Sequence, residues 1–371
     1  MLRLATAPSA KPSSHVIPSG ANPYSDQRLL RQATSRVAAP ITGRRKDLGG
    51  GPASPYPEIL SFLAPPGTRL LLFAGKGGTG KTTCAAAAAL LLAERDPARP
   101  VLLLSTDPAH SLADVLGTPL DDSECPVPGA PPNLRARELD APARYRSWRR
   151  RLQGGLDELL GAELALDRAV VEGLLEVDPP GLDELVAILD LADLAEGDGE
   201  RLVVLDTAPT GHALRLLEMP ALALAWDHAL LAILLKYREV LGLGELAAEL
   251  VELARGLKRL QAVLTDPART RCVAVARAAE LPRRETGRLL AALAGIGVAA
   301  PIVLVNALTP RAGCARCRRA AAAERRQLAA LGRELPAGAA MIRAPAAFPP
   351  PRGAAPLAAW GRSWSWSEST P

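Results

Sequence analysis

The chain has 371 residues and a formal net charge of +5, and 48% of its residues are hydrophobic and 22% charged. This composition is typical of a globular protein with enough apolar material for one large domain or two smaller ones. No uninterrupted apolar run reaches the ~18–20 residues that a membrane span requires. The longest candidate, Pro220–Leu235, is interrupted by Asp227 and His228. We therefore do not expect an integral membrane protein.

The positive charge is concentrated at the start of the chain. The first 46 residues carry eight basic groups and one acid, Asp26, which leaves 36 basic and 38 acidic residues for the rest. A nucleic-acid-binding body usually has its own basic excess, so we expect no nucleic-acid partner. Residues 1–66 are rich in Ser, Pro, Ala and Gly without a sustained apolar period, which predicts a disordered basic leader. An organellar transit peptide is the alternative for this segment.

Five cysteines in a long chain without a secretory signal do not indicate a disulfide scaffold. A reducing cytosol is the simplest compartment, so a cytoplasmic protein is expected, with an organelle as the alternative if the leader is a transit peptide.

Short apolar runs alternate with helical stretches beyond residue 66. The runs are Leu70–Phe73, Val101–Leu104, Leu202–Leu205, Cys272–Ala276 and Ile302–Val305. Buried strands separated by helices predict an α/β fold with a doubly wound, mostly parallel sheet. Two Leu-rich segments, about 141–196 and 219–262, lack strands and predict a helical insert subdomain. In the second, leucines from Leu243 to Leu264 recur every three or four positions, which places them on one helix face.

The strongest signal is a glycine-rich loop between the first predicted strand and a helix, the context that a P-loop requires. Such glycines let backbone N–H groups converge on phosphate, and the helix N-terminus adds partial positive charge. Within the loop, Lys81 would bind the β- and γ-phosphates of ATP, and the Thr82 hydroxyl would ligate Mg²⁺. The nucleotide-binding residues predicted here are Gly75, Lys76, Gly77, Gly78, Thr79, Gly80, Lys81, Thr82 and Thr83.

The early lysine makes the loop similar to the deviant Walker A of a class of dimeric ATPases. In that class the lysine at the position of Lys76 reaches across a dimer to the partner's nucleotide and neutralises charge that develops during phosphoryl transfer. The resemblance therefore implies a P-loop NTPase fold, a homodimer and a catalytic role for Lys76 beside Lys81.

Two further strings narrow the resemblance to the anion-transporting ATPase family. Residues 105–112 resemble its first switch, whose aspartate is catalytic, so Asp107 would orient or deprotonate the attacking water. Residues 202–215 resemble its second switch. There, an apolar strand ending in Asp206 is a Walker B pattern, and Asp206 would hold Mg²⁺ through water.

A third part of the resemblance concerns the base of the nucleotide. Asn306 follows the strand Ile302–Val305 and matches an adenine-reading Asn of the family; a turn-forming Asn is the alternative. Residues 285–289 resemble another family landmark, although the nucleotide-contacting glutamate expected six positions before Glu285 falls on Ala279. The resemblance covers residues 67–357, taken as the ATPase domain, and leaves 358–371 as a tail.

Cys314 and Cys317 form a Cys-x-x-Cys pair after Asn306. One pair supplies half of a tetrahedral zinc site, and a homodimer would supply the other half across its two-fold axis. The family branch that targets tail-anchored membrane proteins has such a pair, which implies a Zn²⁺ shared between subunits. A redox switch and no role at all are the alternatives.

The resemblance implies a Mg²⁺-dependent ATPase that couples hydrolysis to a client. The client is either a hydrophobic membrane protein to be targeted or a membrane anion channel that exports arsenite. A different class of function is an ATP-gated holdase chaperone for hydrophobic segments, in which hydrolysis is secondary.

Overall fold

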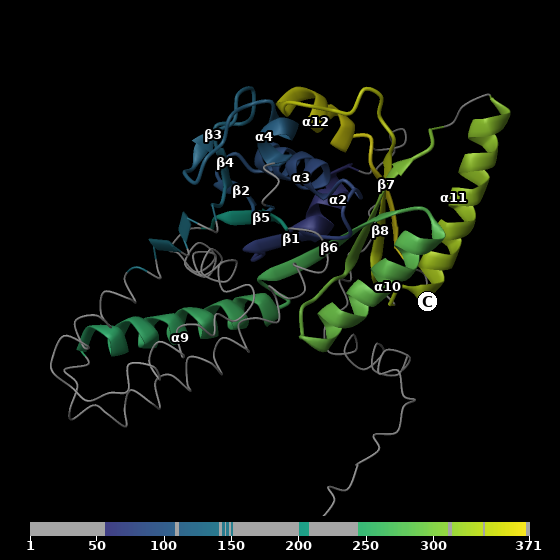
Figure 1. Cartoon of the computed structure of the whole chain (residues 1–371). Coiled ribbons are helices and arrows are strands. Elements are labelled where there is room, and N and C mark those ends of the chain that lie inside the picture. Colours follow the sequence, from purple (N-terminus) through teal and green to yellow (C-terminus); the bar gives the residue numbers. More distant parts are fainter. Residues whose placement is uncertain are drawn as a thin grey trace, which may run out of the picture.

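A computed structural model describes residues 56–107, 111–140, 143–144, 146–147, 150, 200–207, 244–310, 314–336 and 338–368. The central element is a nine-stranded sheet with the order β3-β4-β2-β5-β1-β6-β7-β8-β9. The strands from β4 to β8 are all parallel, and only the edge strands β3 and β9 are antiparallel to their neighbours. This is the predicted doubly wound α/β fold (Figure 1).

Each apolar run predicted to be a strand forms one. These strands are β1 (Leu70–Ala74), β2 (Val101–Ser105), β5 (Leu202–Asp206), β6 (Thr270–Arg277) and β7 (Ile302–Leu308). Residues in β1, β2 and β5 are buried along their whole length because helices cover both faces of the sheet. Four strands were not predicted: β3 (Cys125–Pro126), β4 (Leu134–Glu138), β8 (Ala340–Pro345) and β9 (Ser365–Glu368).

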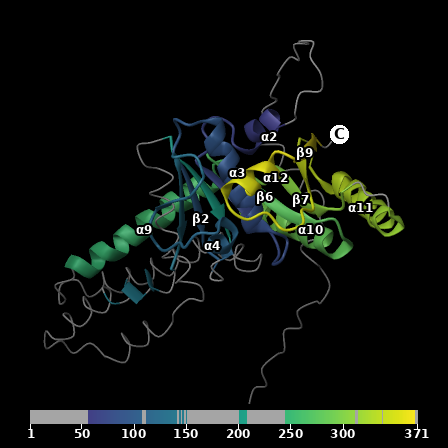
Figure 2. The same ribbon diagram turned by 90° about the horizontal axis from the view of Figure 1, so that it is seen from above.

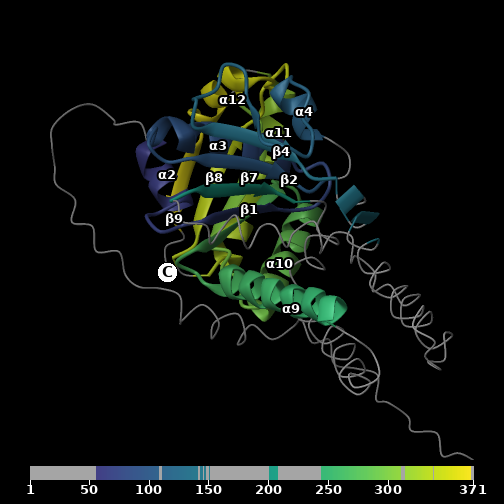
Figure 3. The same ribbon diagram turned by 90° about the vertical axis from the view of Figure 1, so that its left-hand side faces the viewer.

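The helices cover the two faces of the sheet in two separate cores (Figure 3). One face packs against α2 (Tyr56–Leu63), α3 (Lys81–Arg95), α4 (Ser111–Leu116) and α12 (Ala354–Gly361). The other packs against α9 (Gly244–Thr265), α10 (Glu280–Gly295) and α11 (Ala315–Glu334). Helix α3 is central to the first core because its Ala-rich sequence lets it lie close to the strands. Figure 2 shows α9 and α11 toward opposite ends of the molecule.

The prediction of an unstructured stretch up to residue 66 is wrong at its C-terminal end. Helix α2 lies within that stretch and buries Ile59, Leu60 and Leu63 against the core of α3. These residues fall on one face of the helix. The helix is only eight residues long and is flanked by Pro- and Gly-rich sequence, so its apolar pattern was too short to be recognised in the sequence. Residues 1–55 lie outside the described part of the chain.

The C-terminal tail is part of the fold as well. Trp364 is buried, and the Trp360 indole donates a hydrogen bond to the Pro345 carbonyl oxygen at 2.8 Å. Beyond them, β9 pairs with β8, and Trp366 lies 5.6 Å from Phe62 of α2, centroid to centroid. The tail therefore closes one edge of the sheet, and the predicted domain limit at 357 excludes residues that belong to the same core.

Helix α9 confirms part of the predicted leucine face, since Leu257, Leu260 and Leu264 are buried and the last two pack against the sheet. Most of the predicted insert 141–196, and residues 219–243, lie outside the described residues. In the part of the chain that the structure describes, no helix is long and apolar enough to cross a membrane.

Candidate functional site

The phosphate loop connects the carboxyl end of β1 to the first turn of α3, as predicted. Gly80 precedes the helix with φ +90° and ψ 32°, a left-handed conformation that favours glycine. A Cβ atom at Gly80 would collide with the side-chain amide of Asn306, and one at Gly75 would collide with the Val275 carbonyl oxygen. Gly75 and Gly80 are therefore required because β6 and β7 approach the loop too closely for a side chain. This requirement is separate from the space that a bound phosphate would need.

Asn306 lies beside this loop rather than apart from it. Its buried amide donates from Nδ2 to the Thr79 carbonyl oxygen at 2.8 Å, while Oδ1 accepts from the backbone N–H of Ala307 at 2.6 Å. An Asn amide has two N–H donors and two acceptor lone pairs, so one of each remains for a base. The structure thus gives Asn306 a structural contact that the sequence did not predict, and its reading of adenine stays a prediction.

The carboxyl ends of β1, β2 and β5 bring Lys81 and Asp206 together. Asp206 is fully buried, and its Oδ1 atom has no hydrogen-bond partner among the described residues. Burial raises the pKa of Asp206 to about 7, against the opposing effects of the Thr82 hydroxyl and the Lys81 ammonium. Burial likewise lowers the pKa of Lys81, offset in part by Asp206 and Asp107. A buried carboxylate oxygen without a partner fits the water shell of a Mg²⁺ ion.

Two serines that the sequence did not single out complete this arrangement. Ser111, the first residue of α4, places its hydroxyl 3.0 Å from the Thr82 hydroxyl. Ser105 donates from Oγ to Oδ2 of Asp206 at 3.4 Å and accepts from the backbone N–H of Asp107 at 3.2 Å. Ser105 ends β2 in register with Asp206, which ends β5. The signal in the sequence was its position as the polar residue that directly follows a predicted apolar strand.

Asp107, the predicted catalytic carboxylate, lies two residues after the end of β2 and is half-buried. Its charge acts on both Lys81 and Asp206, which places it at the same edge of the sheet. The three residues after it, 108–110, lie outside the described residues, as do 208–215 of the second switch.

A buried glutamate on β4 holds the helix that carries Ser111. Oε1 of Glu138 accepts from the backbone N–H groups of Leu112 and Ala113 at 2.9 and 3.0 Å. These N–H groups lack partners inside α4, and a carboxylate at a helix N-terminus is favourable. Glu138 therefore fixes the position of Ser111 relative to Thr82.

The Lys76 side chain forms an ion pair with a glutamate of α10. Its ammonium lies 2.6 Å from Oε1 of Glu285 on α10, while 51% of the Lys76 side chain and 23% of the Glu285 side chain are exposed. Lys76 also accepts, through its carbonyl oxygen, from the Thr79 hydroxyl at 2.8 Å. The two lysines of the loop are thus engaged by different acids.

The sequence comparisons agree with this geometry. A family model described as anion-transporting ATPase matches residues 68–333. The chain is 29% identical over 251 residues to a protein of Entamoeba histolytica named ATPase ASNA1 homolog, covering 65% of this chain and 76% of that protein. It is 30% identical over 276 residues to ATPase GET3 of Candida glabrata, covering 68% and 75%.

The chain belongs to the anion-transporting ATPase family. Its expected class as an ATPase and its expected fold are therefore confirmed. A further relative, the arsenical pump-driving ATPase of Acidiphilium multivorum, is 33% identical over 269 residues, which cover 72% of this chain but 44% of that protein.

The Cys-x-x-Cys pair of this anion-transporting ATPase lies at the N-terminus of α11, with Cys314 as its N-cap and Cys317 in its first turn. The Cys314 sulfur caps the helix by accepting from the backbone N–H of Cys317 at 3.2 Å. Hydrogen bonds from the Cys317 thiol and backbone lower the pKa of Cys314. No group of three or more His, Cys, Asp or Glu that could hold a metal occurs among the described residues, so a single chain offers there only the two thiols.

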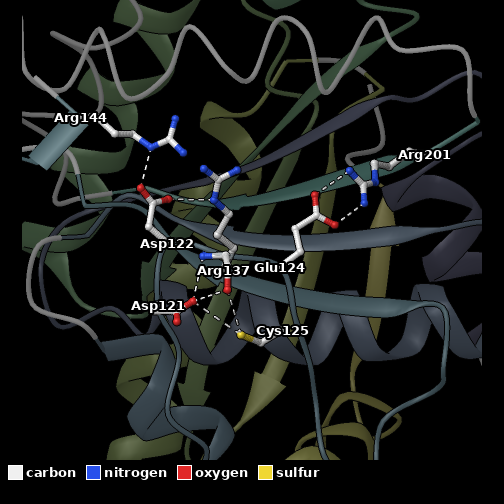
Figure 4. Close-up of polar contacts among 8 residues, drawn as sticks. Asp121, Asp122, Glu124, Cys125, Arg137, Arg144 and Arg201 are labelled. Carbon is white, nitrogen blue, oxygen red and sulfur yellow. Dashed lines mark hydrogen bonds and ion pairs between the residues drawn. The ribbon is translucent and has the colours of Figure 1, made fainter. Parts of the chain in front are cut away.

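The three other cysteines of this family member lie apart from one another. Cys84 and Cys272 are fully buried, which raises the pKa of Cys84 well above its ordinary value and that of Cys272 to about 12. Cys125 begins β3 directly after the acidic loop 121–124, and its thiol donates to Oδ1 of Asp121 at 3.7 Å (Figure 4).

Ion pairs tie that acidic loop to the sheet and to the segments beside it. Asp122 accepts from Arg137 at 2.9 Å and from Arg144 at 2.6 Å. Glu124 binds the Arg201 guanidinium with both oxygens, at 2.9 and 2.5 Å (Figure 4). The loop is thus a structural element of the sheet edge, and the sequence analysis did not identify it.

Proposed function

We propose that the protein is a Mg²⁺-dependent, homodimeric ATPase that couples ATP hydrolysis to the targeting of a hydrophobic membrane-protein client. The observation that carries the ATPase part is the meeting of Lys81, Thr82, Asp107 and Asp206 at the carboxyl edge of the sheet, directly after the glycine-rich loop. Support for the dimer comes from the family resemblance of Lys76, and support for the client comes from the relatives named GET3 and ASNA1, of which the chain covers about three quarters.

Each side chain then has a role that follows from its place. The backbone of 75–80 and the N-terminus of α3 bind phosphate, and the partly desolvated Lys81 supplies a full positive charge. Thr82 and Asp206 would hold Mg²⁺, which supplies Lewis-acid stabilisation of the phosphate charge when bound. Asp107 orients water. Asn306, already fixed against Thr79, offers its remaining donor and acceptor to adenine.

The proposed ATPase is tested by steady-state ATP hydrolysis with three variants. Lys81→Met should abolish ATP binding, and Asp107→Asn should keep binding but lose turnover by 10²-fold or more, on the order expected for loss of a water-positioning carboxylate. Asp114→Asn is the matched control, because Asp114 is exposed on α4, seven residues along the chain. Unchanged turnover in Asp107→Asn would refute the role of Asp107.

The client part is tested with a tail-anchored membrane segment kept in solution. ATP-dependent protection of this segment from aggregation, lost in Lys81→Met, supports targeting. If Asp107→Asn hydrolyses nothing and still protects and releases the segment normally in response to ATP, the protein is an ATP-gated holdase in which hydrolysis is secondary.

An arsenite-export motor is a second candidate, favoured by the 33% identity with an arsenical pump-driving ATPase. Against it, metalloid binding through three thiols needs accessible sulfur, and two of the thiols outside the Cys-x-x-Cys pair are fully buried. Arsenite-stimulated turnover that disappears in Cys125→Ser would favour this candidate; identical turnover with and without arsenite would exclude it.

The shared zinc site is tested by metal content and solution mass. About half a zinc per chain in a dimer, lost in Cys314→Ser/Cys317→Ser, is the expected result. A metal-free protein whose mass is unchanged by the double substitution would refute the bridging site.

A further inference from the structure

The ion pair between Lys76 and Glu285 joins two segments that are far apart in the sequence. Lys76 stands at the start of the phosphate loop, and Glu285 lies in the second turn of α10. The two come together because α10 follows β6, which is the parallel neighbour of β1. The ammonium nitrogen lies 2.6 Å from Oε1, which is a close contact for a charged pair.

The other oxygen of the same carboxylate is less well satisfied. Oε2 of Glu285 is buried and has no hydrogen-bond partner among the described residues. A carboxylate that served only to anchor a helix would usually have both oxygens bonded. Among the described residues, the Glu285 carboxylate therefore has one polar contact, which joins its Oε1 atom to the Lys76 ammonium.

We propose that Glu285 is a positioning residue that holds the Lys76 ammonium in the free chain and gives it up when a nucleotide presents its phosphates. This rests on the proposed function, in which Lys76 must reach phosphate. Phosphate groups carry more negative charge than one carboxylate, and Lys76 is half-exposed, so the pair is weak enough to exchange. The pair acts as a reversible restraint on Lys76 and reduces premature contact between Lys76 and other anions.

A matched control exists within the same chain. Glu94 and Arg362 also form an ion pair at 2.6 Å, with 31% of the Glu94 side chain exposed, but Glu94 lies at the far end of α3 from the phosphate loop. Glu285→Gln and Glu94→Gln therefore each remove one charge from a pair of the same length and similar exposure. Only the first changes the environment of Lys76.

The first readout needs no turnover. Trace acetylation by acetic anhydride, analysed by mass spectrometry, compares the labelling of Lys76 with that of the exposed Lys258 in the same molecule. We expect Glu285→Gln to raise the Lys76/Lys258 ratio by about two- to fivefold, the range for release of a half-exposed ion pair. Glu94→Gln should leave the ratio unchanged. An unchanged ratio in Glu285→Gln would overturn the proposal.

The second readout is ATP hydrolysis at low protein concentration. Glu285→Gln should raise the turnover by about two- to fivefold, and the gain should shrink at high salt. A fall in turnover with an increased labelling ratio would show that Glu285 serves the nucleotide directly, and would overturn the positioning role. If Glu285→Gln does not fold, Glu285→Asp, which keeps the charge on a shorter arm, should shift both readouts in the same direction.

The two proposals can fail separately. A wild type that neither binds nor hydrolyses ATP would refute the proposed function. The Lys76/Lys258 labelling ratios of wild type and Glu285→Gln would still show whether Glu285 restrains Lys76. An active enzyme whose labelling ratio is the same in wild type and Glu285→Gln would leave the proposed function standing and remove the positioning role.

Discussion

Replacement of Gly80 by Ala tests the contact between the phosphate loop and Asn306. An Ala at φ +90° costs about 1–2 kcal/mol for the left-handed backbone. Its Cβ would also displace the Asn306 amide, breaking a buried hydrogen bond of 2.8 Å, for about 1–3 kcal/mol more. The expected total is about 2–5 kcal/mol of unfolding free energy.

Gly78 is the matched control because it has φ +77° and would place its Cβ in open space, with nothing within 4 Å. Gly78→Ala should therefore cost only the backbone term, about 1–2 kcal/mol. The assay is urea unfolding of nucleotide-free protein, followed by far-UV circular dichroism. In an Asn306→Ala background, Gly80→Ala should cost no more than Gly78→Ala. Equal losses for the two single variants, or a full loss that persists without Asn306, would refute the reasoning.

Three further predictions concern burial and charge. In metal- and nucleotide-free protein, the Asp206 carboxyl has a pKa of about 7, whereas in the unfolded chain it releases its proton near pH 4. The unfolding free energy should therefore fall as the pH rises from about 4 to 7, by up to ~1.4 kcal/mol per pH unit. Urea titrations at each pH should show this slope in the wild type and not in Asp206→Asn. Glu138→Gln should weaken the cap of α4 by about 1 kcal/mol and lower ATP turnover, because Ser111 would lose its fixed position beside Thr82. The affinity for ADP, measured by calorimetry, should not change. A turnover equal to that of the wild type would argue against a role of Glu138 in placing Ser111. Trp364→Ala should cost about 3–5 kcal/mol in thermal or urea unfolding because this indole is only 2% exposed, and a loss below 1 kcal/mol would show that the tail does not belong to the core.

The parts of the fold that the sequence predicted share a local cause. A buried parallel strand is a short apolar run, and a P-loop is a fixed spacing of glycines and lysines after such a run. Both signals are complete within about ten residues, so Leu70–Thr82 and Leu202–Asp206 were identified correctly.

The missed parts depend on contacts between distant residues. Strand β4 has the sequence Leu-Arg-Ala-Arg-Glu, which does not resemble a buried strand, yet Arg137 and Glu138 are buried because Asp122 and the N-terminus of α4 satisfy them. The contact of Asn306 with Thr79 and that of Lys76 with Glu285 likewise require the strand order, which a single sequence does not contain.

The place of β1 in the sheet has a consequence for how the protein is made. Leu70 pairs with Val203 on one side and with Thr270 on the other. The strand that leads into the phosphate loop therefore has no neighbour until more than half of the chain has been made, and it gains the second only when β6 follows. Asn306, which touches the loop, arrives later still. Pairing over such separations is slow, and an unpaired apolar strand is prone to aggregate. A ribosome-bound fragment ending before β6 should therefore not retain ATP, and its incompletely paired strand β1 would be a natural substrate for a chaperone during synthesis.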